Sequence, residues 1–556
     1  MTKRVILSHR HILEEEDGTV TKEWGGKKPI CLVFPNYYHV GMSNLGFQLL
    51  YQHLNSLQGV VCERAFLPEK GEWEEYVRSN TPLLSLESCR PLPQFQIIAF
   101  SLPFENDFLQ LLSILHLAKI PLKTKERDER VPLIMAGGAA VTLNPEPLAP
   151  YVDLFCIGEG EEVLVDLLNV FQGGRSGGRR GFLEEAARIE GVYVPALYQA
   201  TYDGHGFIKE FSPMEGTAPA QVKRRWIKNP SRHPSHSAIL TPLTEFKDMF
   251  LLEVNRGCPG RCRFCAARAL HLPFRNREMD TLIKEANLGL QKGRRIGLVG
   301  SALTDHPRFT ELCEYIVEKG GKISIASIRA DAITDKLANL LALSGYRTVA
   351  IAPEAGTERL RKVVRKGFTE EEILTSVEVL AAHGIKNLKL YFIIGLPTET
   401  PEDTEGILDL TKRIRHQMVK GGRTAGGITL SINPFIPKAW TPFQWHPFEE
   451  VKSLKEKIKV IKKGLRNVPR LRVLHELPKW GYIQTLLSTG DRRMAEPLLL
   501  AFQTKEDWRF ALRESYINPD FWAYRKKKKD ETLPWDFIDH GLDKESLWKE
   551  YEETIR

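Results

Sequence analysis

The chain has 556 residues, a length that predicts three or four domains of about 100–200 residues each. Hydrophobic residues make up 42% and charged residues 27%, which is typical of a globular protein, and no apolar run reaches the ~20 residues of a membrane span. The net charge of +8 permits contact with nucleic acid but does not predict it.

The N-terminal residues MTKRVILSHRHILEEEDG turn acidic where a signal peptide would stay apolar, so we expect a cytoplasmic protein without a membrane span. Residues 29–168 then alternate apolar, strand-like runs (ICLVFP, IIAFSLPF, VPLIMAGG, DLFCIGEG) with helical segments. This rhythm predicts a parallel, doubly wound, Rossmann-like sheet in a domain of residues 1–171. Ligands of such sheets lie at the carboxyl ends of the strands.

The glycine- and arginine-rich run QGGRSGGRRGFL indicates a boundary, and we expect residues 172–246 to form a connector. From 247 to 446 the alternation resumes, with strand candidates at 249–255, 295–300, 322–328, 346–352, 387–395 and 427–435. Six β/α units predict a (β/α)6 partial TIM barrel whose chemistry lies at the strand ends. Residues 447–556, which are lysine-rich at first, are predicted to be mainly helical. The expected fold class is therefore α/β, with this helical region at the C-terminal end.

Three of the eight cysteines lie in NRGCPGRCRFCAAR, with the spacing Cys258-x3-Cys262-x2-Cys265. A structural zinc site needs four ligands, and His271 is a candidate for the fourth, but no second cysteine pair follows. A [4Fe–4S] cluster normally takes four thiolates, so three would leave one iron open to a substrate or cofactor. The loop follows the first predicted barrel strand, at the catalytic end, and this favours iron–sulfur over zinc.

The cysteine spacing, with Phe264 before the last thiol and Glu253-Val254-Asn255-Arg256-Gly257 before the first, resembles the radical S-adenosylmethionine (SAM) superfamily. The resemblance covers at least residues 247–445. It implies that the open iron chelates SAM and that the reduced cluster cleaves SAM to a 5′-deoxyadenosyl radical, which abstracts a hydrogen atom. An electron donor such as flavodoxin or ferredoxin is implied as a partner.

Further cofactor-binding candidates follow from the resemblance at the ends of the predicted strands: Phe264, Gly300, Ser301, Ser327, Arg329, Glu354, Tyr391 and Gly395. Gly300 and Ser301 occupy the place of a Gly-Gly-Glu-like turn, from which this chain departs. Ser327 and Arg329 would lie on one side of a strand and meet the ribose and carboxylate of SAM, since arginine suits planar anions. A structural salt bridge is the alternative role of Arg329.

Two kinds of N-terminal domain precede radical SAM barrels in known families. In methylthiotransferases the domain carries three cysteines for an auxiliary cluster, but the sequence contexts of the candidate trio do not match: Cys31, Cys62 and Cys89. The other kind binds cobalamin, and residues 29–170 resemble it through small-residue signatures after two strands: Ser101, Leu102, Gly137 and Gly138. The usual Asp-x-His-x-x-Gly motif is absent, and His39 is interpreted as a turn residue.

We therefore expect a radical SAM enzyme with a [4Fe–4S] cluster on Cys258, Cys262 and Cys265, which functionalises an unactivated carbon as a cobalamin-dependent methyltransferase. The substrate is a small molecule, an RNA or a protein. One alternative is a radical SAM enzyme whose cobalamin domain is vestigial and which acts on RNA or a ribosomal protein. The other is a zinc-stabilised RNA-binding protein that uses the lysine-rich C-terminal part.

Overall fold

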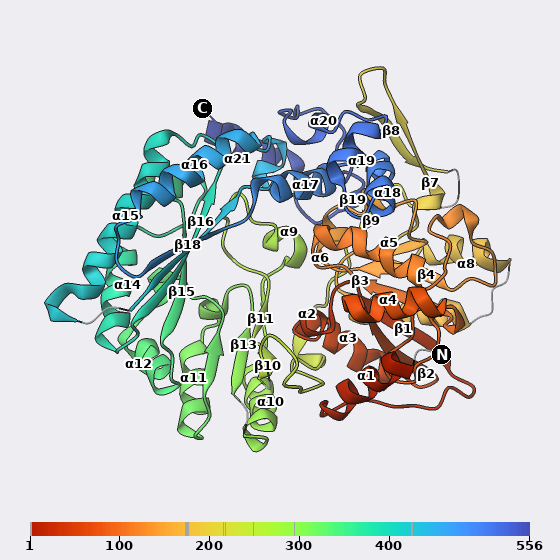
Figure 1. Ribbon diagram of the computed structural model, residues 1–556, viewed down its shortest axis with the longest axis horizontal. Helices are drawn as coiled ribbons and strands as arrows, with labels where there is room; N and C mark the ends of the chain where they lie inside the picture. Colours follow the sequence, from red (N-terminus) through yellow and green to blue (C-terminus); the bar gives the residue numbers. More distant parts are fainter. Residues whose placement is uncertain are drawn as a thin grey trace.

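The computed structural model describes residues 3–172, 177–214, 216, 218–247, 249–293, 295–423 and 426–555. Part of the glycine-rich run that opens the predicted connector lies outside these residues. Two α/β units lie side by side, and C-terminal helices extend over both of them (Figure 1). Within the described ranges, no helix is both long enough and apolar enough to cross a bilayer.

The N-terminal unit is a six-stranded sheet in the order β2-β1-β3-β4-β5-β6. Its strands are β1 (Lys28–Phe34), β2 (Val60–Phe66), β3 (Ile97–Ser101), β4 (Leu133–Gly137), β5 (Leu154–Cys156) and β6 (Val192–Tyr193). All neighbours are parallel except β5 and β6. The strand order reverses between β1 and β3, and ligands of doubly wound sheets bind at such a reversal.

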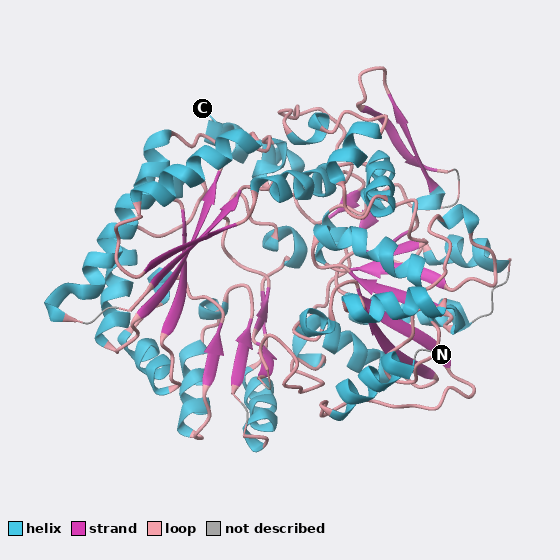
Figure 2. Ribbon diagram, viewed as in Figure 1, coloured by secondary structure: helices cyan, strands magenta, loops and turns pink. Residues whose placement is uncertain are grey.

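Helices cover both faces of this sheet (Figure 2). They are α1 (Lys3–Glu14), α2 (Tyr38–Gly41), α3 (Leu45–Ser56), α4 (Lys70–Ser79), α5 (Phe108–Leu117), α6 (Ala139–Leu143), α7 (Gly160–Gln172) and α8 (Gly178–Ala186). The strands are almost wholly buried, as in the run Ile30 to Phe34, because both of their faces are covered. That double burial is why the sequence shows continuous apolar runs here rather than alternation.

The second unit is an open arc of seven parallel strands in two hydrogen-bonded sheets. The first sheet holds β10 (Phe250–Glu253), β13 (Ile296–Val299) and β14 (Ile323–Ile325), and the second holds β15 (Thr348–Glu354), β16 (Asn387–Ile394), β17 (Ile428–Pro434) and β18 (Leu471–His475). The Ile328 amide donates to the Ala350 carbonyl (3.1 Å) and joins the two sheets. The expected α/β fold with a parallel-sheet core is confirmed.

Helices line the outside of this arc (Figure 1): α10 (Met279–Gln291), α11 (Phe309–Glu318), α12 (Asp335–Leu343), α13 (Glu358–Val363), α14 (Glu370–Ala382), α15 (Pro401–Val419) and α16 (Val451–Gly464). Along β16, buried residues alternate with half-buried ones. Leu390 and Phe392 are fully buried in the core, while Tyr391 points the other way, toward the inside of the arc.

One strand of this unit was not expected, and one sequence expectation is wrong. β18 was not expected, since residues 447–556 were predicted to be mainly helical; it pairs along its length with β17, but it is partly exposed and carries Arg472, so it lacks an apolar signature. β14 ends at Ile325, so Ser327 and Arg329 lie in the loop after it. The argument that they share one side of a strand therefore fails.

The C-terminal helices are α17 (Pro478–Thr489), α18 (Ala495–Gln503), α19 (Trp508–Glu514), α20 (Asp520–Ala523) and α21 (Lys544–Ile555). They join the two units: the Asn144 side chain donates to the carbonyls of Ser488 (3.1 Å) and Gly490 (2.8 Å). In the predicted connector, β7 (Tyr198–Tyr202) and β8 (Ile208–Pro213) form a hairpin, and β9 (Val222–Lys223) pairs with β19 (Ile538–Asp539).

Candidate functional site

The cysteine loop is held at its base by two short antiparallel strands, β11 (Asn255–Arg256) and β12 (Arg275–Asn276). Gly257 has φ +84°, and a Cβ there would lie 2.7 Å from the His271 carbonyl oxygen, so the turn into the loop requires glycine. The loop returns through α9 (Ala267–His271). The three cysteines, all half-buried, therefore lie in a closed loop between β11 and α9.

One cation and one backbone amide near the thiols favour an anionic centre there, against the effect of burial. Burial raises the pKa of Cys262 to about 11, and the nearby Lys366 opposes that rise. The Gly260 amide donates to Cys258 Sγ (3.3 Å). In the part of the chain that the structure describes, no three His, Cys, Asp or Glu side chains converge on a point that would hold one metal ion. A cluster gives each thiolate its own iron and so does not need the thiols to converge on one point, and the three thiols of the loop supply the donor set of such a group.

Glu354 ends β15 in a left-handed conformation (φ +65°). Its carboxylate accepts from Lys366 Nζ (2.9 Å). Burial raises the pKa of Glu354, and Lys366 counteracts the rise. The charge of Lys366 also acts on Cys262 and Cys265, so this ion pair lies beside two of the thiols.

Gly300 and Ser301 follow β13. A Cβ on Gly300 would lie 2.4 Å from Asn255 Oδ1, and the Asn255 side-chain amide donates to the Ala302 carbonyl (2.7 Å). The turn therefore packs against the residue that begins the cysteine loop, which requires a glycine at 300. Ser301 is exposed beside it.

Arg329 forms the salt bridge that was its alternative role. It pairs with Asp331 (2.5 Å) and lies 3.7 Å from Asp305 Oδ1, and its charge acts on Cys258. Asp305 Oδ2 is buried without a hydrogen-bond partner. Ser327 is exposed. Arg329 thus lies on the cysteine side of the arc, held mainly by Asp331, with Asp305 as a more distant partner.

The three remaining candidates, Tyr391, Gly395 and Phe264, have partners other than the cysteines. Tyr391 is half-buried, with Lys389 Nζ 4.8 Å from its ring centre. Gly395 (φ +80°) donates its amide to Glu399 Oε2 (2.6 Å), and a Cβ there would approach the Glu449 side chain. Phe264 is half-buried against the apolar cluster around Trp445. None of these contacts involves a cysteine.

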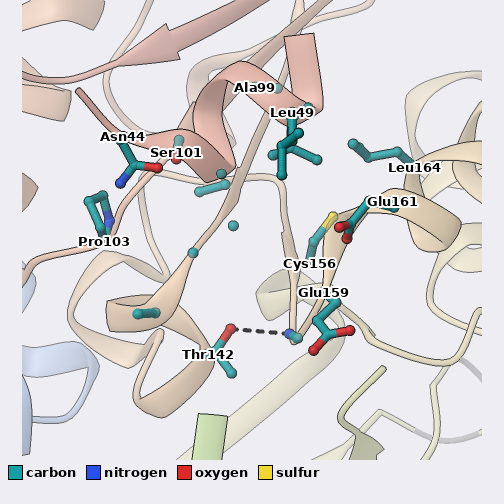
Figure 3. Close-up of a pocket in the computed structure, with 18 of the residues that line it drawn as sticks. Asn44, Leu49, Ala99, Ser101, Pro103, Thr142, Cys156, Glu159, Glu161 and Leu164 are labelled. Carbon is teal, nitrogen blue, oxygen red and sulfur yellow. Dashed lines mark hydrogen bonds between the residues drawn. The ribbon is translucent and has the colours of Figure 1, made fainter. Parts of the chain in front are cut away.

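A cavity of about 340 Å³ opens at the carboxyl ends of the N-terminal strands, next to the strand-order reversal (Figure 3). Ser101, Gly137 and Gly138 line it, as the sequence suggested. Leu102 does not; its side chain is fully buried, and its carbonyl oxygen would lie 2.6 Å from a Cβ on Gly138. Sequence reasoning missed further lining residues, including Leu49, Thr142 and Leu164, because they come from helices and turns.

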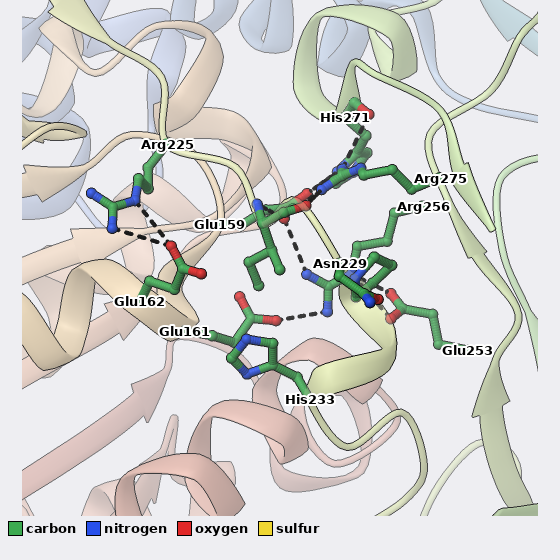
Figure 4. A network of polar contacts seen from close by, with 12 residues as sticks. Glu159, Glu161, Glu162, Arg225, Asn229, His233, Glu253, Arg256, His271 and Arg275 are labelled. Carbon is green, nitrogen blue, oxygen red and sulfur yellow. Dashed lines mark hydrogen bonds and ion pairs between the residues drawn. The ribbon is translucent and has the colours of Figure 1, made fainter. Parts of the chain in front are cut away.

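The wall of this cavity that faces the second unit is a buried ion network (Figure 4). Arg256 pairs with Glu161 (2.6 Å) and with Glu253 (3.0 Å), and Arg275 pairs with Glu159 (2.6 Å). Burial alone would raise the pKa of Glu159, but contacts from His271 and the arginines outweigh it and hold that pKa well below its usual range. Arg256 therefore belongs both to the wall of the cavity and to the base of the cysteine loop.

Residues 252–411 match the family model described as the radical SAM superfamily. Residues 46–195 match the model described as the N-terminal part of radical SAM proteins. An uncharacterized protein of Methanocaldococcus jannaschii is 30% identical over 478 residues, which cover 85% of this chain and 90% of that protein. The chain belongs to the radical SAM superfamily. It is therefore an enzyme, and the cofactors of its superfamily are a [4Fe–4S] cluster and SAM.

Other proteins are similar to this chain over part of their length. An uncharacterized methyltransferase of Pyrococcus horikoshii is 26% identical, over 52% of this radical SAM chain and 60% of that protein. Among solved structures, the cobalamin-dependent SAM radical enzyme OxsB, with aqua-cobalamin and SAM bound, has a TM-score of 0.51 at 17% identity, over 90% of this chain and 64% of that one. The last likeness shows a shared fold.

Proposed function

We propose that this radical SAM enzyme is a cobalamin-dependent methyltransferase that acts on an unactivated carbon. The observation that carries the proposal is the shared wall: a cavity at the carboxyl ends of β1 and β3–β5 lies directly behind Arg256, two residues before Cys258. Two cofactor sites back to back suit a reaction that needs both an electron and a methyl group. When bound, the cluster supplies the electron that splits SAM, and cobalamin supplies the methyl group.

In this proposal Cys258, Cys262 and Cys265 hold the cluster. The residues near the thiols would then orient SAM: Gly300 through its close approach to Asn255, and Arg329 by pairing with the SAM carboxylate while Asp331 anchors it. Tyr391 would contact the adenine from the inner face of β16.

The kinds of residues that line the cavity suit a flat macrocycle. Apolar side chains such as Leu49 and Leu164 form one side, and Gly137 and Gly138 keep backbone exposed on another. No histidine of the described N-terminal unit lines it, since His39 lies elsewhere, 3.6 Å from Glu245. The N-terminal unit would therefore hold cobalamin by shape and backbone contacts, and the one histidine among the lining residues, His271, comes from the cysteine-loop side, where it faces Glu159 across 3.9 Å.

The test is anaerobic purification with iron, sulfide and hydroxocobalamin, followed by visible spectra and mass analysis. We expect about four irons and one cobalamin per chain, and labelled methyl transfer from SAM to a candidate substrate. Leu164→Trp, which fills the cavity, should lose cobalamin and keep iron. A wild-type protein with full iron that retains no cobalamin would overturn the proposal.

A second candidate keeps radical SAM chemistry but has an N-terminal unit without cobalamin and an RNA substrate. The observation that favours RNA is a groove along α16 lined by six cations and no carboxylate: Lys455, Lys459, Lys462, Lys463, Arg466 and Lys479. RNA affinity that falls steeply with salt, and that charge reversal at Lys463 weakens, would support this candidate.

No specific observation supports the two remaining alternatives, which are an auxiliary cluster of the methylthiotransferase kind and a zinc-stabilised RNA-binding protein. Cys31 and Cys62 are fully buried in core strands, far from the loop-end position an auxiliary cluster requires. His271, the candidate fourth zinc ligand, faces Glu159 across 3.9 Å.

A further inference from the structure

A second hollow, of about 470 Å³, opens on the surface next to the cysteine loop. We call it the basic hollow, because its charged lining consists of five cations and one carboxylate: Arg261, Arg361, Lys362, Arg365, Lys366 and Glu358. It is separate from the cavity proposed to hold cobalamin, with which it shares no lining residue.

The basic hollow is built onto the cysteine loop itself. Arg261 immediately precedes Cys262 in the chain. The Arg263 amide donates to the Val364 carbonyl (3.0 Å), and the Arg263 guanidinium donates to the Val363 carbonyl (2.8 Å), so the loop is fastened to the end of α13. Lys366 lines the hollow and acts electrostatically on Cys262. Lys366 thus belongs both to this surface and to the surroundings of the thiols.

Other sides of the loop are covered by protein. On the N-terminal side, Arg256 is buried in its pairs with Glu161 and Glu253. Behind α9, the buried His540 contacts the Ala269 carbonyl (2.9 Å). The basic hollow is therefore a solvent-facing approach to the thiols.

The charges of the hollow are only partly neutralised. Arg261 is exposed and has no ion-pair partner among the described residues. Lys362, whose side chain is 78% exposed, pairs with Glu358 on the surface. Arg365 pairs with Glu550 (2.9 Å).

Arg361 adds a buried cation at the wall of the hollow. It is 1% exposed, its Nε and Nη2 have no hydrogen-bond partner, and the nearest carboxylate, that of Glu370, lies 3.9 Å away. A concave surface with surplus positive charge and a buried cation concentrates potential and attracts an anionic partner.

We propose that the basic hollow is the docking site of a small acidic electron-carrier protein of the flavodoxin or ferredoxin type. This inference rests on the proposed function, which consumes an electron from outside the protein. One electron passes from the carrier, which is oxidised by one electron, to the cluster on Cys258, Cys262 and Cys265, which is reduced by one; no bond forms or breaks. Electron-transfer contacts are small and transient, and charge complementarity sets their rate of association.

The test uses the reconstituted full chain, reduced flavodoxin and two charge reversals, Arg261→Glu and Lys362→Glu. Oxidised flavodoxin is also titrated against the protein by calorimetry. We expect each variant to weaken flavodoxin binding and to slow cluster reduction by tenfold or more at low salt, while wild type loses the same advantage as salt is raised. With dithionite, which needs no docking site, SAM cleavage by both variants should equal that of wild type.

Lys459→Glu, a reversal on the exposed face of α16 outside the hollow, is the matched control and should bind flavodoxin as wild type does. The docking site is disproved if Arg261→Glu and Lys362→Glu bind and accept electrons normally, or if Lys459→Glu is equally defective. A wild-type protein that cleaves no SAM with dithionite would instead refute the proposed function. The flavodoxin titration measures binding alone, so it tests the docking site separately.

Discussion

Arg256 and Glu161 form an ion pair of 2.6 Å between the strand β11 at the base of the cysteine loop and the helix α7 beside the proposed cobalamin cavity. Their side chains are 8% and 10% exposed. The pair therefore connects the two α/β units at the point where the two proposed cofactor sites meet. Arg256 also faces Glu159 (3.3 Å), so one cation balances several carboxylates there.

Loss of the Arg256 charge should be costly. Arg256→Met leaves buried carboxylates facing one another, and we expect it to lower the free energy of unfolding by about 3–5 kcal/mol. Glu161→Gln, which keeps a hydrogen-bond acceptor, should cost about 1–3 kcal/mol. Chemical denaturation, followed by tryptophan fluorescence, measures both.

The control for these variants is Glu162→Gln on the same helix. Glu162 pairs with Arg225 (3.1 Å), but its side chain is 42% exposed, so its loss should change stability by no more than about 1 kcal/mol. If Glu161→Gln and Glu162→Gln lowered the free energy of unfolding equally, the pair of Arg256 with Glu161 would stabilise the protein no more than an exposed ion pair does.

Gly138 and its neighbour Gly137 provide a second, closely matched comparison. Gly138 has φ +112°, and a Cβ there would lie 2.6 Å from the Leu102 carbonyl oxygen, whereas a Cβ on Gly137 would make an ordinary contact at 3.5 Å with Cys156. Gly138→Ala should therefore destabilise the protein by about 1–3 kcal/mol and abolish cobalamin retention. Gly137→Ala should stay within about 1 kcal/mol of wild type. Thermal unfolding and cobalamin titration measure these effects. A larger loss in Gly137→Ala than in Gly138→Ala would contradict the prediction.

The strands of the N-terminal unit could be predicted because parallel strands with two covered faces leave long apolar runs in the sequence. β18 escaped prediction because it is the partly exposed edge of the arc, where packing with β17 rather than apolar composition fixes the strand. The cysteines could be predicted from spacing within one loop. The pair of Arg256 with Glu161 could not, since 95 residues separate the two and only the docking of the units brings them together.

Each of Cys258→Ala, Cys262→Ala and Cys265→Ala should reduce bound iron from about four atoms per chain to nearly none, because two thiolates hold the cluster poorly. Iron analysis and the brown absorption of the reconstituted protein measure the loss.

Cys31→Ala is the control, since Cys31 is fully buried in β1 and serves packing alone in this interpretation. It should keep its iron at a stability cost of about 1–2 kcal/mol. Wild-type protein with about eight irons, half of them lost in Cys31→Ala, would reveal a second cluster and favour the methylthiotransferase arrangement.

His540 links stability to pH. Burial lowers the pKa of His540 to about 4, and the ring contacts the Ala269 carbonyl behind α9. In the unfolded chain a histidine titrates near pH 6.5, so below that pH the unfolded state binds the proton first. The contribution of His540 is therefore complete above about pH 6.5 and declines as the pH falls toward 4, by up to roughly 3 kcal/mol.

His540→Asn keeps a donor for the Ala269 carbonyl and removes the titration. The stability advantage of wild type over this variant should shrink as pH falls from 7 to 4.5, as measured by denaturant unfolding at each pH. Burial also lowers the pKa of His446 to about 4. The stability difference between wild type and the double variant with His446→Asn should therefore change about twice as much over this pH range. Wild-type and variant curves that run parallel across this range would show that His540 does not oppose protonation in the folded protein.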